Sequence, residues 1–103
     1  MESPFILTDK LNLKDIYVFG SAKYSLDKAD DLDILIIYKS EKCSPMEVRP
    51  LLSSFIIELE CYFKKIIHLV ILSNDEEESV NFIKKENCLR FEDWFYNNNF
   101  KFN

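Results

Sequence analysis

The chain has 103 residues, of which 48% are hydrophobic, and a formal net charge of −5 at pH 7. This length suits one packed core, so we expect a single domain over residues 1–103. The negative charge disfavours strong general binding to nucleic acid, and no apolar run approaches the roughly 20 residues that cross a bilayer.

The first predicted elements are two strands joined by a polar loop. Residues 15–19 (DIYVF) are β-branched and aromatic and run directly into Gly20 and Ser21, which predicts a strand that ends in a turn. The loop at 22–30 is polar and unpatterned. Residues 32–38 (LDILIIY) are almost continuously apolar, which favours a strand buried on both faces.

A helix is predicted over residues 44–63. Its apolar residues fall at helical spacing: Met46, Leu51, Leu52, Phe55, Ile56, Leu59 and Phe63. Ser44 and Glu47 have the spacing of a capping box, and Pro45 suits the first helical position. Pro50 removes one backbone hydrogen bond, so we expect either a kink there or a helix that begins near it.

The remaining elements are a strand, a helix, a short strand and a tail. Residues 66–72 (IIHLVIL) predict the strand, and Asn74 is expected to cap a helix over 75–85, whose first turn is acidic. Residues 88–91 predict a short edge strand. The tail at 93–103 is aromatic, and its rings either fold back on the core or stay exposed for a partner or a second copy.

The cysteines and the N-terminus indicate a cytoplasmic protein. The chain has three cysteines, Cys43, Cys61 and Cys88, which is an odd number at wide spacing. This pattern matches neither a secreted disulfide framework nor a zinc knuckle, so reduced thiols are expected. The N-terminus lacks the basic start and unbroken apolar stretch of a signal peptide, and no membrane contact is expected.

Gly20 is the only glycine in the chain, and it follows a predicted strand. Glycine is needed where the backbone takes a positive dihedral angle or where a phosphate approaches closely, and Ser21 adds a hydroxyl and another N–H. On the dipeptide alone, an ordinary turn is the favoured interpretation.

Asp31 and Asp33 lie two residues apart at the start of the second predicted strand. Side chains at this spacing point to the same face, so the two carboxylates are expected side by side. Like charges at such distance are costly unless they are neutralised, and oxygen ligands suit Mg²⁺. A solvated acidic turn is the alternative interpretation.

Taken together, these elements resemble the DNA polymerase β-like nucleotidyltransferase superfamily. The likeness rests on the strand, Gly20-Ser21, the loop at 22–30, Asp31-Leu32-Asp33 and the following apolar strand. It is strongest to the small stand-alone bacterial nucleotidyltransferase domains of minimal type, and it covers about residues 15–92. It implies an α+β fold, in which a mixed β-sheet and helices form two layers.

The resemblance also implies a site and a reaction. Gly20 and Ser21 would bind a nucleoside triphosphate such as ATP, while Asp31 and Asp33 would hold two Mg²⁺ ions with it. The reaction would transfer a nucleoside monophosphate to a hydroxyl of a protein, a nucleic acid or a small molecule. Active members carry a third carboxylate on the next strand, and the matching position here is His68, a poor Mg²⁺ ligand that can accept a proton.

This departure leaves two functional hypotheses open. In the first, the protein is a Mg²⁺-dependent nucleotidyltransferase with Asp31, Asp33 and His68 as catalytic residues. In the second, it is a catalytically weak or inactive binding module, an antitoxin-like partner of a helical HEPN-type protein. A homo-oligomer formed through the aromatic tail is also open, as is chance likeness to an unrelated small α/β domain.

Overall fold

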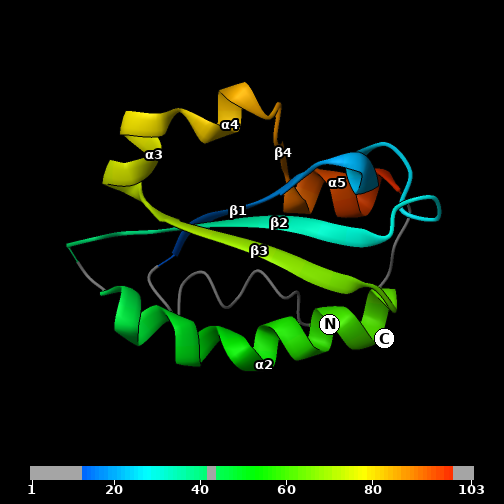
Figure 1. Ribbon diagram of the computed structural model, residues 1–103, viewed down its shortest axis with the longest axis horizontal. Helices are drawn as coiled ribbons and strands as arrows, with labels where there is room; N and C mark the ends of the chain where they lie inside the picture. Colours follow the sequence, from blue (N-terminus) through cyan, green and yellow to red (C-terminus); the bar gives the residue numbers. More distant parts are fainter. Residues whose placement is uncertain (1–12, 42–43, 99–103) are drawn as a thin grey trace.

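A computed structural model describes residues 13–41 and 44–98 of the chain. Within this part, four strands form one mixed sheet with helices packed on it (Figure 1), which confirms the α+β class. The strands are β1 (Leu13–Phe19), β2 (Asp31–Tyr38), β3 (Ile66–Ser73) and β4 (Leu89–Arg90). No helix in the described ranges combines the length and the apolar character that crossing a membrane requires.

The sheet order is β3-β2-β1-β4, so β2 lies inside the sheet between β1 and β3. β1 pairs antiparallel with β2 and β4, whereas β2 and β3 pair parallel. From Ile34 to Tyr38 every side chain of β2 is buried. The continuous apolar run of this strand therefore reflects burial on both faces, as expected.

The long helix α2 (Pro45–Phe63) connects the parallel strands β2 and β3 and lies along one face of the sheet (Figure 1). It begins at Pro45 and continues through Pro50, so the alternative of a start near Pro50 is wrong. The single backbone bond lost at Pro50 is offset because the rest of the helix buries a row of apolar side chains. The side chain of Glu47, expected in a capping box, lies outside the described part.

The larger core forms between α2, the sheet and a C-terminal helix, α5 (Phe91–Asn97). Its fully buried large side chains include Leu32, Ile34, Leu52, Phe55, Phe91, Trp94 and Phe95. The Trp94 ring lies 5.6 Å from that of Phe63 at the end of α2. Of the two alternatives for the tail, Trp94 and Phe95 therefore fold back on the core, while Tyr96 is 48% exposed. Phe100 and Phe102 lie outside the described residues.

The opposite face of the sheet is covered only in part, by the short helices α3 (Asn74–Val80) and α4 (Phe82–Lys85). Helices therefore lie on both faces, so the expected two layers, one of sheet and one of helices, are found only in part. Figure 1 shows α2 on one side of the sheet and α3 and α4 on the other. A smaller cluster forms here, in which the rings of Phe19 and Phe82 meet edge to face at 5.0 Å between centroids.

Two details of the predicted helix over 75–85 are wrong. The cap is Ser73 rather than Asn74, because Ser73 and Glu76 form a reciprocal capping box and the Asn74 side chain accepts from Ser40 instead. The helix is also interrupted at Asn81, which has a φ of 56°. The Glu77 carboxylate accepts the backbone N–H of Phe82 beyond this break, so the interruption is stabilised.

Candidate functional site

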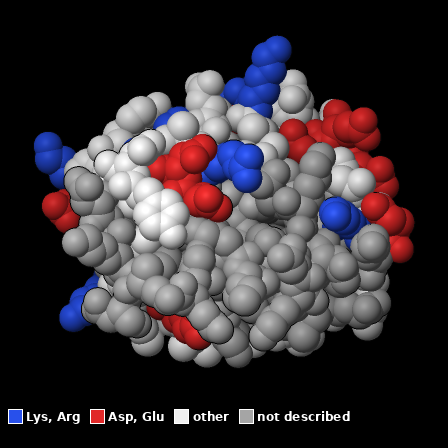
Figure 2. Space-filling model, turned by 180° about the vertical axis from the view of Figure 1, so that it is seen from behind, with Lys and Arg blue, Asp and Glu red and all other residues white. Residues whose placement is uncertain are grey.

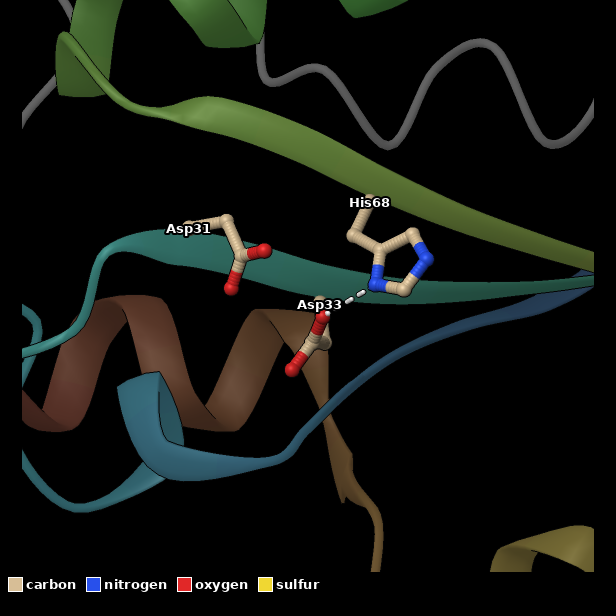
Figure 3. A group of neighbouring side chains, drawn as sticks. All are labelled: Asp31, Asp33 and His68. Atoms are coloured by element: carbon tan, nitrogen blue, oxygen red, sulfur yellow. Dashed lines mark hydrogen bonds and ion pairs between the residues drawn. The ribbon is translucent and has the colours of Figure 1, made fainter.

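Three polar side chains meet on the partly covered face, at the end of the sheet where β2 begins (Figure 3). Asp31 and Asp33 come from β2, and His68 comes from β3, where it is the register partner of Asp33. One potential ligand atom from each residue lies within 4.8 Å of the other two. The expectation that both carboxylates share a face is correct, and the arrangement could hold a metal ion.

His68 and Asp33 contact each other directly. The Nδ1 of His68 lies 3.0 Å from Oδ1 of Asp33, a distance at which an Nδ1–H donates to a carboxylate. The His68 side chain is 68% exposed and that of Asp33 is 15% exposed. The site thus has a partly buried carboxylate at its base and an accessible imidazole at its edge.

The environment of Asp33 disfavours its charged form. Burial raises the pKa of the Asp33 carboxyl above its ordinary value, and the negative charge of Asp31 raises it further, while the hydrogen bond from His68 opposes these effects. A cation placed among these groups would reverse the penalty, because it would pair with both carboxylates.

Gly20 lies against the Asp33 carboxylate. It follows Phe19, the register partner of Asp33, and has a φ of 73° and a ψ of −162°, a conformation that only glycine adopts easily. A Cβ on Gly20 would fall 2.1 Å from Oδ2 of Asp33. A positive dihedral angle or the close approach of a phosphate was expected at Gly20. The positive φ is confirmed, and the group that lies closest is the carboxylate of Asp33.

Ser21 opens a short 3₁₀ turn, η1 (Ser21–Lys23), and is exposed next to Gly20. In the same turn, the Nζ of Lys23 donates to the carbonyl of Asn87 at 2.6 Å. It also lies 4.7 Å from the centre of the Tyr24 ring. Lys23 therefore has a structural role, because it ties the loop after Gly20 to the segment before β4.

A second lysine, which the sequence did not single out, supports the start of β2. The Nζ of Lys65 donates to the carbonyl of Ala29 at 2.6 Å, two residues before Asp31. The bond joins the loop before β2 to the residue before β3, so it helps to hold the two strand ends that carry the site. Only the tertiary pairing identifies this partner, because a lysine before a strand is ordinarily solvated.

Charged side chains on the described surface are mixed. Figure 2 shows the molecule from behind, and the acidic and basic side chains coloured there lie in small neighbouring groups rather than in one extended basic area. This view agrees with the net charge of −5. On this face, the described side chains offer no broad surface for a polyanion.

Comparison of the chain with protein-family models, with curated proteins and with solved structures finds no match. Two carboxylates and an imidazole at the end of a sheet form a set that can bind one divalent ion, and oxygen ligands of this kind are those that Mg²⁺ takes.

Proposed function

We propose that the protein transfers a nucleoside monophosphate from a nucleoside triphosphate to a hydroxyl group, with divalent metal held by Asp31 and Asp33. The observation that supports this most is the convergence of Gly20, Asp33 and His68. They come from three different segments, yet Gly20 packs on the Asp33 carboxylate and His68 bonds to it. An ordinary turn after β1 would not require this contact.

In the proposed reaction, the acceptor oxygen forms a bond to the α-phosphorus while the bond from that phosphorus to the bridging β-phosphate oxygen breaks. Pyrophosphate leaves, and the acceptor hydroxyl loses its proton. A bound divalent ion, Mg²⁺ by the resemblance, would offset the negative charge of the phosphates. His68 stands where the resemblance implies a third carboxylate, and its imidazole is suited either to accepting this proton or to binding the metal.

Calorimetric titration tests the proposal. The protein is titrated with ATP, GTP, CTP and UTP in turn, with and without Mg²⁺. We expect Mg²⁺-dependent binding of at least one triphosphate, weakened roughly tenfold or more by Asp31→Asn or Asp33→Asn because each removes a charged ligand. Asp30→Asn is the matched control, since Asp30 is exposed and lies outside the group of three.

Transfer itself is followed as release of pyrophosphate, with the same variants. If the doubly substituted protein, Asp31→Asn with Asp33→Asn, binds triphosphate and releases pyrophosphate as the wild type does, the proposed site is wrong. If the folded wild type binds none of the four triphosphates, the proposed reaction is wrong.

A second candidate function is a binding module without effective catalysis, an antitoxin-like partner of a helical HEPN-type protein. His68 favours it, because a neutral imidazole supplies no negative charge where the resemblance implies a carboxylate. Changing His68 to Asp separates the two candidates. A rise in pyrophosphate release indicates a site that has lost its third carboxylate, whereas a fall indicates that His68 takes part in the reaction.

We also propose that two copies of the chain associate through the exposed part of α5. Tyr96 is 48% exposed, next to the buried Phe95. Sedimentation of the wild type and of Tyr96→Ser shows whether this ring joins two copies: a dimer that becomes a monomer in the variant supports the contact.

A further inference from the structure

The spacing of His68 and Asp33 has the value expected for two ligands of one metal ion. Their facing atoms, Nδ1 and Oδ1, lie 3.0 Å apart. Two ligands at right angles, each about 2.1 Å from an ion, are also about 3.0 Å apart. An ion bound to both atoms would lie beside the line that joins them, so it would displace the shared proton and the exposed imidazole would turn toward it, while the two ligand atoms keep their spacing.

The backbone places the two residues opposite each other. Asp33 and His68 are register partners on adjacent parallel strands, and Gly20 packs against the other oxygen of Asp33. Asp31 lies on the same face and has a ligand atom within 4.8 Å of the others. Since these constraints hold without an ion, binding would require little ordering of the site.

The donor set distinguishes between kinds of ion. Carboxylate oxygens suit Mg²⁺ and Mn²⁺ alike, whereas imidazole nitrogen suits transition metals and is a poor partner for Mg²⁺. A site of three oxygen ligands would favour neither Mg²⁺ nor Mn²⁺ strongly. Replacement of one oxygen by the nitrogen of His68 shifts the preference toward the transition metals.

We propose that His68 is a metal ligand, bound through Nδ1, and that Asp31, Asp33 and His68 bind a divalent first-row transition-metal ion such as Mn²⁺ in preference to Mg²⁺. This inference deepens the proposed function by naming the ion, and it rests on the same site. It assigns His68 to metal binding rather than to proton transfer.

Electron paramagnetic resonance with Mn²⁺ tests the proposal in protein free of nucleotide. His68 is the only histidine in the chain, so nitrogen coupling to bound Mn²⁺ in the pulsed spectrum reports on this side chain. Mn²⁺ is preferred to Zn²⁺ as the probe because the soft sulfur atoms of free cysteines such as Cys61 and Cys88 compete for Zn²⁺. We expect one bound Mn²⁺ per chain, with nitrogen coupling, and displacement by Mg²⁺ only in more than about tenfold excess.

Two variants at the same position complete the experiment. His68→Ala should lose the nitrogen coupling and bind Mn²⁺ roughly tenfold or more weakly. His68→Asp should also lose the coupling but keep Mn²⁺ and let Mg²⁺ compete on nearly equal terms. The His68 side chain is 68% exposed, so neither change removes buried contacts, and circular dichroism verifies the fold.

Three results would overturn the proposal: no bound Mn²⁺, bound Mn²⁺ without nitrogen coupling, or equal affinity in the wild type and His68→Ala. These results are separate from those that test nucleotidyl transfer. Mg²⁺-dependent triphosphate binding without nitrogen coupling leaves the proposed function standing and refutes this inference. Nitrogen-coupled Mn²⁺ without any triphosphate binding supports this inference and refutes the proposed function.

Discussion

The two faces of the sheet differ in how completely helices cover them. On one face, α2 and α5 enclose a continuous core that includes Phe55, Trp94 and Phe95. On the other, the described residues that are buried in the cluster under α3 and α4 are Phe19, Leu35 and Ile37, and the end of the sheet beyond them carries Asp33 and His68.

This difference places most of the stabilising core on one face of the sheet and the candidate site on the other. Burial of apolar area is the main favourable contribution to folding, and most of it lies on the α2/α5 face. The opposite face is then free to hold groups that lower stability, such as two neighbouring carboxylates. The protein can carry a costly site because the core on the far face does not depend on it.

Paired substitutions of phenylalanine give the largest expected effect. Phe55→Ala should lower the free energy of unfolding by about 3–5 kcal/mol, since Phe55 is fully buried in the larger core. Phe82→Ala, on the partly covered face, should cost only about 1–2 kcal/mol because its side chain is half-buried. Urea unfolding followed by the fluorescence of Trp94, the single tryptophan, measures both. Equal losses would contradict the comparison of the two faces.

Gly20→Ala should have an intermediate effect on stability and a large one on the site. The new Cβ would meet Oδ2 of Asp33 in a conformation that suits glycine alone, so we expect a loss of about 1–3 kcal/mol. Displacement of Asp33 should weaken Mn²⁺ binding roughly tenfold or more. Lys28→Ala, at an exposed position in the same loop, is the control and should change neither quantity. Wild-type Mn²⁺ affinity in Gly20→Ala would show that the contact does not position the carboxylate.

Asp33→Asn should have the smallest effect on stability, and it should stabilise the metal-free protein rather than destabilise it. Burial and Asp31 raise the pKa of Asp33, so between the ordinary value of 3.8 and the raised one the folded state keeps a proton that the unfolded chain has lost. Stability therefore falls as the pH rises through this window, and the penalty is complete above it. Removing the carboxylate should raise the melting temperature of the metal-free protein at pH 7 by roughly 1–4 °C.

The pH dependence provides the check on this sign. In the presence of a chelator, the difference in melting temperature between Asp33→Asn and the wild type should shrink as the pH falls below 3.8, where the wild-type carboxyl is protonated in both states. Asp30→Asn, at an exposed neighbouring position, should show little difference at any pH. A lower melting temperature for Asp33→Asn at pH 7 would mean that its bond with His68 outweighs the burial of charge.

Local patterns predicted the strands and the pairing of the two carboxylates. Alternation along a strand places Asp31 and Asp33 on one face, whereas His68 was assigned to the site by the resemblance, and the parallel pairing of β2 with β3 brings it there. The contact of Gly20 with Asp33 could not be predicted, because it depends on the register of β1 and β2. The hydrogen bond from Lys65 to the carbonyl of Ala29 could not be predicted either, because it depends on the pairing of β2 with β3.

Two features, α5 and the cap of α3, had a recognisable sequence pattern that the prediction assigned to a neighbouring element or residue. Phe91, Trp94 and Phe95 have helical spacing, but Phe91 was included in the predicted edge strand, so α5 was not recognised. Ser73 and Glu76 likewise have the spacing of a capping box, and the prediction placed the cap one residue later. The cap was therefore placed one residue too late, whereas α5 was missed as an element because its first residue was assigned to a strand.

The indole of Trp94 donates from Nε1 to the carbonyl of Ala22 at 3.3 Å, across 72 residues of sequence. During synthesis, the loop that follows Gly20 therefore leaves the ribosome long before the helix that supports it. Until α5 is made, the nascent chain exposes the apolar side of β1, including Ile16 and Val18, to chaperones and to other chains. An interrupted chain that lacks α5 would therefore carry Asp31, Asp33 and His68 without the hydrogen bond that supports the loop after Gly20.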